Sequence, residues 1–354
     1  MLRRQDVGHR MVVRRIVGIR DGRTVFSDAL GELVELTETH LTMATAKGEL
    51  RVPLTEVHRA KRVPPARRPT ATAVVGLELA ANEAWPAPVQ DRLGDWRLRA
   101  AGGWTGRANS ALPIGDPDRP LEAAIDAVVD WYAARHQPAT INVPLPLAAP
   151  IGIALDRRGW TARPPVLVQT IPLTALLAAV PPRTDLPPVR LDTEPSAAWV
   201  ALAAARKAAQ AAELPAAALP AAQAAELSAT ALPAAELPAA AWHVLTAVDQ
   251  VRFAHLYADL DDADPQLLGV ARGTVTGEGR WLGLTLIEVV PAARRQGLAR
   301  QLVRALADWA VERGASHAFL QVEEHNSGAV ALYRRLGFTT HHTYVSRVAP
   351  EIGR

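Results

Sequence analysis

The chain has 354 residues, of which 49% are hydrophobic and 21% are charged, and its formal net charge is +3 at pH 7. At roughly 100–200 residues per domain this length predicts two or three domains, and the apolar content excludes disorder as the main state. Cysteine is absent, which excludes a disulfide-stapled scaffold, a Cys-rich zinc site and any mechanism through a cysteinyl intermediate.

The first residues contain no apolar stretch typical of a secretory signal, so we expect none. Two long uncharged runs, 137–155 and 164–182, are interrupted by prolines and are interpreted as strands and loops rather than membrane spans. Arginine supplies 36 of the 39 basic residues, and alanine is abundant. This bias is typical of a GC-rich bacterial genome and favours a cytoplasmic enzyme.

Residues 1–66 are predicted to form a small, basic, antiparallel β-barrel. Turn sequences at Asp21-Gly22 and Lys47-Gly48 separate short strands. The strands are expected at 11–19, 24–26, 31–36, 40–44 and 50–53. Residues 1–69 carry 14 Lys and Arg against 8 Asp and Glu, a net charge of +6. Such a field attracts nucleic acid or an acidic partner, but one aromatic residue, Phe26, offers little for base stacking, so a solvated basic face is preferred.

A proline-rich linker at 63–69 is followed by an internal repeat with an offset of 178 residues. The matched positions are Pro113 with Pro291, Asp130-Trp131 with Asp308-Trp309, and Gly159-Trp160 with Gly337-Phe338. Amphipathic patterns predict corresponding helices at 121–134 and 299–313. Each copy is predicted to be an α/β unit, with domain bounds of 72–182 and 185–350.

An Ala/Pro-rich insertion at 208–241 lies between the matched parts of the two copies. Alanine and leucine favour helix, but prolines interrupt the segment every few residues. We interpret it as broken helical turns or an inert surface insertion, with a substrate lid as the alternative.

The segment 288–300 of the second copy predicts a strand, a short loop and the start of a helix. Gly297 and Ala299 place no bulky side chain over the loop, so consecutive backbone amides can point outward at the helix N-terminus. Arg294, Arg295 and Arg300 add positive charge. This combination predicts a cradle for a pyrophosphate group.

In these residues the second copy resembles the GCN5-related N-acetyltransferase (GNAT) superfamily. Arg294, Gly297 and Ala299 match the family's Arg/Gln-x-x-Gly-x-Gly/Ala signature, after a strand ending in Val-x-Pro. Asn326 and the segment 329–338, which reads AVALYRRLGF, match its second signature. The N-terminal module resembles the SH3-like module of an actinobacterial, histone-acetyltransferase-like group. The resemblance implies an α/β (α+β) fold with two mixed-sheet GNAT-like units.

The resemblance also implies acetyl-CoA as co-substrate, no metal, and direct attack by an amine acceptor in a ternary complex. Tyr333 matches the tyrosine that protonates the departing sulfur, with a packed aromatic as the alternative. Glu288 is the candidate general base, with a solvated strand carboxylate as the alternative. The cofactor-binding candidates are Val289, Val290, Arg294, Arg295, Gln296, Gly297, Leu298, Ala299, Arg300 and Asn326.

Among these candidates, the amides near Val289 and Val290 are expected to bind pantetheine and polarise the thioester. Asn326 binds the cofactor or is a plain turn residue. The acceptor is expected to be an amine-bearing small molecule or a protein or peptide. A non-catalytic protein binding nucleic acid or an acidic partner through residues 1–66 is the alternative function.

The first copy is predicted to be degenerate. At the offset of 178, Arg294 maps to Asp116, Gln296 to Asp118, Gly297 to Arg119 and Ala299 to Leu121, so carboxylates replace the cradle and would repel a pyrophosphate. Tyr333 maps to Asp156. One acetyl-CoA per chain is therefore expected.

His341-His342 is the one sequence feature that suggests a metal. Neighbouring residues of a strand point to opposite faces, and no partner ligands follow at useful spacing. No metal site is predicted.

Overall fold

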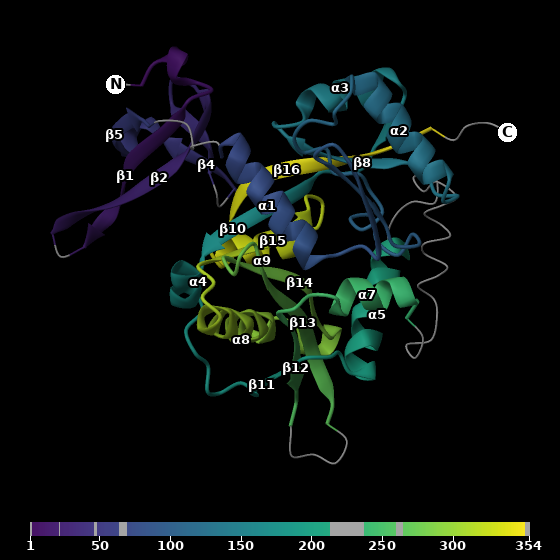
Figure 1. Cartoon of the computed structure of the whole chain (residues 1–354). Coiled ribbons are helices and arrows are strands. Elements are labelled where there is room, and N and C mark those ends of the chain that lie inside the picture. Colours follow the sequence, from purple (N-terminus) through teal and green to yellow (C-terminus); the bar gives the residue numbers. More distant parts are fainter. Residues whose placement is uncertain are drawn as a thin grey trace. The chain divides into compact units, whose positions relative to one another are not determined.

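The computed structural model describes residues 2–20, 22–45, 48–63, 69–212, 237–259 and 265–350. The chain divides into two compact units, Met1–Arg68 and Pro69–Arg354, and each is considered by itself (Figure 1). The predicted insertion at 208–241 falls mostly outside the described residues, so the lid interpretation is not addressed by the structure.

The N-terminal unit is a five-stranded antiparallel sheet in the order β4-β3-β2-β1-β5. Its elements are η1 (Arg4–Asp6), β1 (Arg10–Arg20), β2 (Arg23–Leu36), β3 (His40–Thr45), β4 (Gly48–Pro53), η2 (Leu54–Glu56) and β5 (Val57–Arg62). A small core of alternating inward residues includes Val13, Leu33, Leu41 and Met43, each fully buried.

Two expectations for this unit need correction. The strands predicted at 24–26 and 31–36 form one strand, β2, and β5 was missed because its sequence, VHRAKR, has little apolar alternation. Among the described residues β4 and β5 do not pair with each other, so the sheet is open and the SH3-like closed barrel is not confirmed.

The larger unit is an α/β structure built on one mixed sheet. Its first part contains α1 (Ala71–Ala84), β6 (Val89–Leu93), β7 (Trp96–Ala100), α2 (Leu121–Ala133), β8 (Thr140–Leu145), α3 (Ala149–Arg157), β9 (Thr161–Ala162), β10 (Val166–Pro172) and α4 (Leu173–Ala179). Its second part contains β11 (Val189–Asp192), α5 (Ala197–Ala212), α7 (Ala239–Thr246), β12 (Val251–Tyr257), β13 (Leu267–Thr276), β14 (Trp281–Val289), η5 (Pro291–Ala293), α8 (Leu298–Glu312), β15 (His317–Glu323), α9 (Ser327–Arg335) and β16 (Thr339–Val348).

The main sheet draws strands from both predicted copies. Its order is β11-β12-β13-β14-β15-β10-β16-β8, and β9 also pairs with β16. Only β14 and β15 are parallel, while the other named pairs are antiparallel. Strand β10 lies between β15 and β16 (Figure 1). The boundary predicted at 182–185 therefore divides the sequence but not the sheet.

Equivalent elements of the two copies lie at the 178-residue offset of the sequence repeat. The bounds of α3 and α9 differ by 178 residues at both ends. A parallel bridge joins Ala111 to Ile141, at the positions that correspond to residues of β14 and β15. The first copy thus has a single parallel bridge, whereas the second copy has the parallel strand pair β14 and β15.

Helix α8 covers one face of the sheet, and α1, α5 and α7 cover the other (Figure 1). On the second face, Arg272 is fully buried and donates hydrogen bonds to the carbonyls of Ala84 (3.0 Å), Leu245 (2.8 Å) and Val244 (3.3 Å). These carbonyls lie at the C-terminal ends of α1 and α7, where a helix dipole favours a cation. Burial still lowers the pKa of Arg272 to about 9. One arginine thus joins helices from the two parts of the chain.

Candidate functional site

Strands β14 and β15 separate in the middle of the sheet. They pair only from Trp281 to Leu284 on β14, against His317 to Leu320 on β15. Beyond that point β14 continues along β13 as far as Val289, through a bulge near Leu286, which has a φ of 52°. The bulge bends β14 away from β15. Beyond Leu284 and Leu320, the backbone groups that these two strands turn toward each other no longer pair.

The two amides expected to bind a ligand differ in orientation. The Val290 N–H donates to the carbonyl of Leu268 at 2.9 Å, so it is already used by β13. Hydrogen-bonded and non-hydrogen-bonded pairs alternate along an antiparallel ladder, so the N–H of Val289 points to the other side, where β15 has separated. The Val289 carbonyl points the same way and accepts a hydrogen bond from Arg294 Nε at 3.0 Å. Of the two amides, Val289 faces the gap.

The loop after β14 turns sharply into α8. Arg295 and Gly297 have positive φ angles of 65° and 93°, and Gly297 is the N-cap residue of α8. The backbone amides of residues 295–299 make no hydrogen bond to the described part of the chain, and the first turn of α8 contains no acidic residue. Unpaired amides at the positive end of a helix dipole are suited to an anion.

The arginines predicted for this anion make different contacts. Arg294 binds Glu288 Oε1 at 2.9 Å through Nη2 as well as the Val289 carbonyl. Arg300 Nη2 donates to the carbonyl of Ala179, at the C-terminal end of α4, at 2.7 Å. The side chains of Arg295 and Gln296 are exposed. The structure therefore brings Arg294 and Glu288 together and directs Arg300 toward α4.

Tyr333 of α9 is close enough to Glu288 of β14 to feel its charge. Burial and, to a smaller extent, the negative charge of Glu288 together raise the pKa of the Tyr333 hydroxyl to about 12. The ring of Tyr333 packs edge-on against Phe338, with 5.9 Å between centroids, and remains partly accessible. The side chain of Glu288 is 15% exposed. At neutral pH this arrangement keeps a protonated phenol near a carboxylate, as a proton donor and a proton acceptor require.

Asn326 has a structural role. It is the N-cap residue of α9, and its Oδ1 accepts the backbone N–H of Ala329 at 3.2 Å. Its expected contact with a cofactor remains a prediction.

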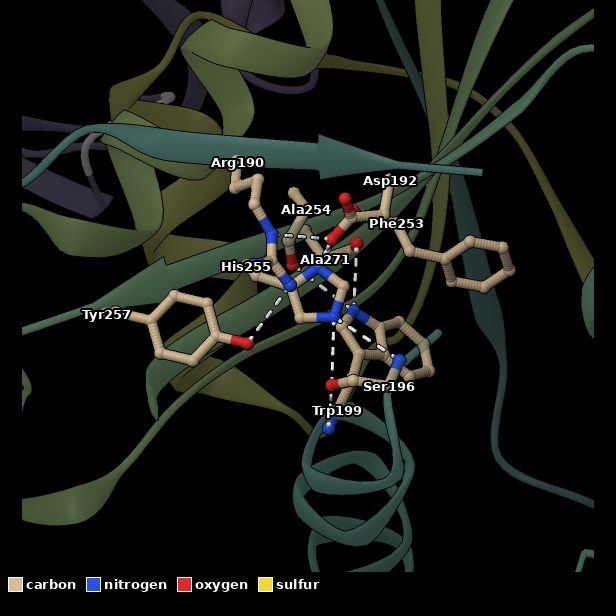
Figure 2. Close-up of polar contacts among 9 residues, drawn as sticks. All are labelled: Arg190, Asp192, Ser196, Trp199, Phe253, Ala254, His255, Tyr257 and Ala271. Carbon is tan, nitrogen blue, oxygen red and sulfur yellow. Dashed lines mark hydrogen bonds and ion pairs between the residues drawn. The ribbon is translucent and has the colours of Figure 1, made fainter. Parts of the chain in front are cut away.

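A polar cluster at the start of α5 was not predicted (Figure 2). Ser196 Oγ lies 3.0 Å from His255 Nε2, and His255 Nδ1 lies 3.1 Å from Asp192 Oδ2, which also accepts from Arg190 Nε at 2.8 Å. The order of groups is that of a Ser-His-Asp triad. However, Ser196 Oγ also accepts the N–H of Trp199, as in a helix cap, and His255 is fully buried.

The cluster therefore anchors α5 to β11 and β12 rather than presenting a nucleophile. Burial lowers the pKa of His255, and the Asp192 carboxylate opposes that change. No sequence signal connects these residues, because they meet only through strand pairing between β11 and β12.

The expectation that His341 and His342 point to opposite faces is wrong. The pairing of β10 with β16 shifts register next to these residues, and the two Nδ1 atoms lie 2.8 Å apart. His342 Nε2 then reaches Glu78 Oε1 at 2.7 Å inside the protein. Among the residues that the structure describes, no group of three or more His, Asp or Glu side chains could hold a metal ion.

Comparison with known proteins decides the family. The model of the family described as "Probable histone acetyltransferase Rv0428c C-terminal" matches residues 71–347. The chain belongs to this family. It is an N-acetyltransferase of the GNAT superfamily, which favours the enzyme over the non-catalytic binding protein.

Relatives across most of the length support the assignment. "Uncharacterized N-acetyltransferase YobR" from Bacillus subtilis is 27% identical over 281 residues, which is 77% of this chain and 98% of that protein. "Probable histone acetyltransferase Rv0428c" from Mycobacterium tuberculosis is 28% identical over 287 residues, or 77% of this chain and 74% of that protein.

A solved structure, "GCN5-related N-acetyltransferase from Kribbella flavida", superposes with a TM-score of 0.52 at 18% identity. The match covers 80% of this chain and 97% of the other. At that identity it supports the fold, which is the mixed-sheet GNAT-like fold expected from the sequence. Within the described residues, no helix is long and apolar enough to cross a membrane.

Proposed function

We propose that the chain binds one molecule of acetyl-CoA and transfers its acetyl group to an amine by direct attack in a ternary complex. The observation that carries the proposal is the separation of β14 from β15 next to a helix N-terminus with unpaired amides.

The cofactor would lie with its diphosphate on the amides of residues 295–299 and its pantetheine along the exposed edge of β14. The N–H of Val289 would hold the pantetheine arm and polarise the thioester carbonyl. Gly297 fits this role, because its φ of 93° disfavours any side chain and keeps the backbone open at the start of α8.

Acetyl-CoA supplies an activated carbonyl carbon with a thiolate leaving group. The amine nitrogen forms a bond to this carbon, and the bond from carbon to sulfur breaks. Tyr333 would give its phenolic proton to the departing sulfur, and the Glu288 carboxylate would accept the proton that the amine loses, directly or through water. The chain has no cysteine to carry the acetyl group, which favours direct transfer.

The acceptor class is an amine on a small molecule or on a protein. One relative is named a probable histone acetyltransferase, so a protein lysine belongs in the first set of acceptors to test, beside free amines and peptide N-termini.

Titration calorimetry with acetyl-CoA tests the binding part, and one site per chain is the expected result. Two sites, or none, would contradict the proposal. Initial rates measured at varied concentrations of acetyl-CoA and of an amine acceptor test the order of events. Direct transfer predicts intersecting double-reciprocal lines, and parallel lines would show a covalent acetyl-enzyme instead.

A further inference from the structure

The segment that connects α4 to β11 passes the N-terminal end of α8 and is held there by side chains of that helix. Arg300 and Arg304 donate to the carbonyls of Ala179 and Val180, at 2.7 and 2.8 Å. Gln301 Nε2 contacts the carbonyl of Arg183 at 3.4 Å. The connecting segment therefore has a defined path over the outer side of the helix.

This path brings the Arg183 side chain close to the cradle. A methyl group built on Gly297 would lie 3.7 Å from Arg183 Nη1 and 3.7 Å from Leu186 Cδ1. Leu186 packs against the core that contains Leu298 and Leu302 of α8. Arg183 is thus next to the N-cap residue of α8, although it is 114 positions away in the sequence.

The Arg183 guanidinium lies near other positive groups of the site. The N-terminus of a helix carries a partial positive charge, and Arg294 and Arg295 add to the local positive field. Arg183 donates hydrogen bonds to the Asp185 carboxylate from both Nε and Nη2. Both side chains are about half exposed, 49% and 63%, so solvent screens the pair and a stronger anion can replace the carboxylate.

We propose that Arg183 is a phosphate-binding residue of the cofactor site, which exchanges Asp185 for the diphosphate of acetyl-CoA when the cofactor binds. The inference rests on the proposed function and extends it, because the segment that joins the two copies then supplies part of the site. Guanidinium groups bind phosphate oxygens in a bidentate manner, and Asp185 holds the group in place until the phosphate arrives.

Calorimetry with coenzyme A tests this proposal at the level of binding, without turnover. Arg183→Ala is expected to weaken binding about tenfold. Arg14→Ala is the matched control, since Arg14 forms a similarly exposed pair with Asp28 in the N-terminal unit. It should leave the affinity unchanged. Asp185→Asn removes the competing carboxylate and is expected to tighten binding two- to threefold.

The opposite effects of the two variants separate phosphate binding from a structural role. If Arg183 and Asp185 only stabilised the connecting segment, both substitutions would weaken binding, and that result would overturn the proposal. An Arg183→Ala affinity within twofold of the unaltered protein would also overturn it. Dephospho-coenzyme A should show the same tenfold loss, and a loss seen only with coenzyme A would overturn the assignment to the diphosphate.

These outcomes are distinguishable from failure of the proposed function. If Gly297→Trp abolishes binding while Arg183→Ala does not change it, the cradle stands and the role of Arg183 is wrong. If the unaltered protein binds no coenzyme A, the proposed function itself is wrong.

Discussion

The N-termini of α2 and α8 occupy equivalent places in the two copies but satisfy their backbone amides differently. Before α2, the N–H of Asp116 donates to Asp95 Oδ2 and the N–H of Asp118 donates to Asp116 Oδ1, both at 2.9 Å. Pro120 is the N-cap residue of α2 and has no N–H, and Glu122 places an acid in the first turn. In the first copy, carboxylates of the protein itself therefore accept two amides of the loop before α2.

The second copy has no such internal anion. Its first turn contains no acid, its N-cap is Gly297, and the amides of residues 295–299 are without acceptors in the described chain. The amides at a helix start need an acceptor from the protein or from outside it. Under the proposed function the difference has a consequence: carboxylates of the first copy already accept two amides of its loop, whereas the amides before α8 stay available for the cofactor diphosphate.

Substitution of Gly297 is expected to have the largest effect. Gly297→Trp places an indole over the cradle at a φ of 93° and should weaken acetyl-CoA binding more than 100-fold. The equivalent change in the first copy, Arg119→Trp, lies on an exposed loop and should leave binding unchanged. Calorimetry measures the acetyl-CoA affinity of both variants, and melting curves confirm that each is folded. Equal losses would show that the two loops are not functionally different.

Removal of the Tyr333 hydroxyl is expected to have the second-largest effect. Tyr333→Phe should lower kcat about 100-fold with little change in the Kd for acetyl-CoA, because a positioned proton donor is lost. A pKa of about 12 means that the unaltered phenol stays protonated from pH 6 to 10, so its titration should not shape the rate profile there.

The control for Tyr333 is its first-copy counterpart Asp156, which pairs with Arg347 of β16. Asp156→Asn should leave kcat unchanged. Unchanged turnover in Tyr333→Phe would remove the role of Tyr333 as an acid and leave the cofactor site intact.

A smaller effect is expected at the start of α9. Asn326→Ala removes the hydrogen bond that Asn326 Oδ1 accepts from the Ala329 amide. It makes the N-cap of α9 the same as that of α3 in the first copy, where Ala148 offers no side-chain hydrogen bond. The loss should be about 1 kcal/mol of stability, seen as a melting temperature lower by about 2 °C. An additional fall in acetyl-CoA affinity would show that the Asn326 amide also binds the cofactor.

The smallest effect is expected from Asp116→Asn together with Asp118→Asn. Both residues are exposed, so the stability should change by about 0.5 kcal/mol. Pro120 still lacks an N–H and Leu121 still occupies the place of Ala299. Calorimetry should therefore continue to show one acetyl-CoA per chain, and a second site would mean that the carboxylates alone had blocked the first copy.

Much of this architecture could be predicted from local patterns in the sequence. The amphipathic repeat predicted α2 and α8 to within one residue at each end, and the motif at 288–300 predicted the strand, loop and helix that form the cradle. The same offset of 178 residues relates α3 to α9 in the structure. These features depend on periodicity and on neighbouring residues, which a single sequence contains.

Contacts between distant segments could not be predicted in this way. Nothing in the segment 166–172 indicates that β10 pairs with β15 and β16, because pairing partners are selected by the assembled sheet. The same holds for Arg183 beside Gly297 and for His255 beside Ser196. The ion pair between Arg294 and Glu288 was also missed, since each residue had a separate predicted role.

The position of β10 between two strands from the end of the chain has a consequence for the timing of folding during synthesis. This strand leaves the ribosome before β15, and its two neighbours begin at residues 317 and 339. At about 5–20 residues per second, roughly 7 to 30 s pass between completion of β10 and the start of β15. During that interval both edges of β10 are without their final partners, and unpaired strand edges are sites where another chain can pair and aggregation can begin.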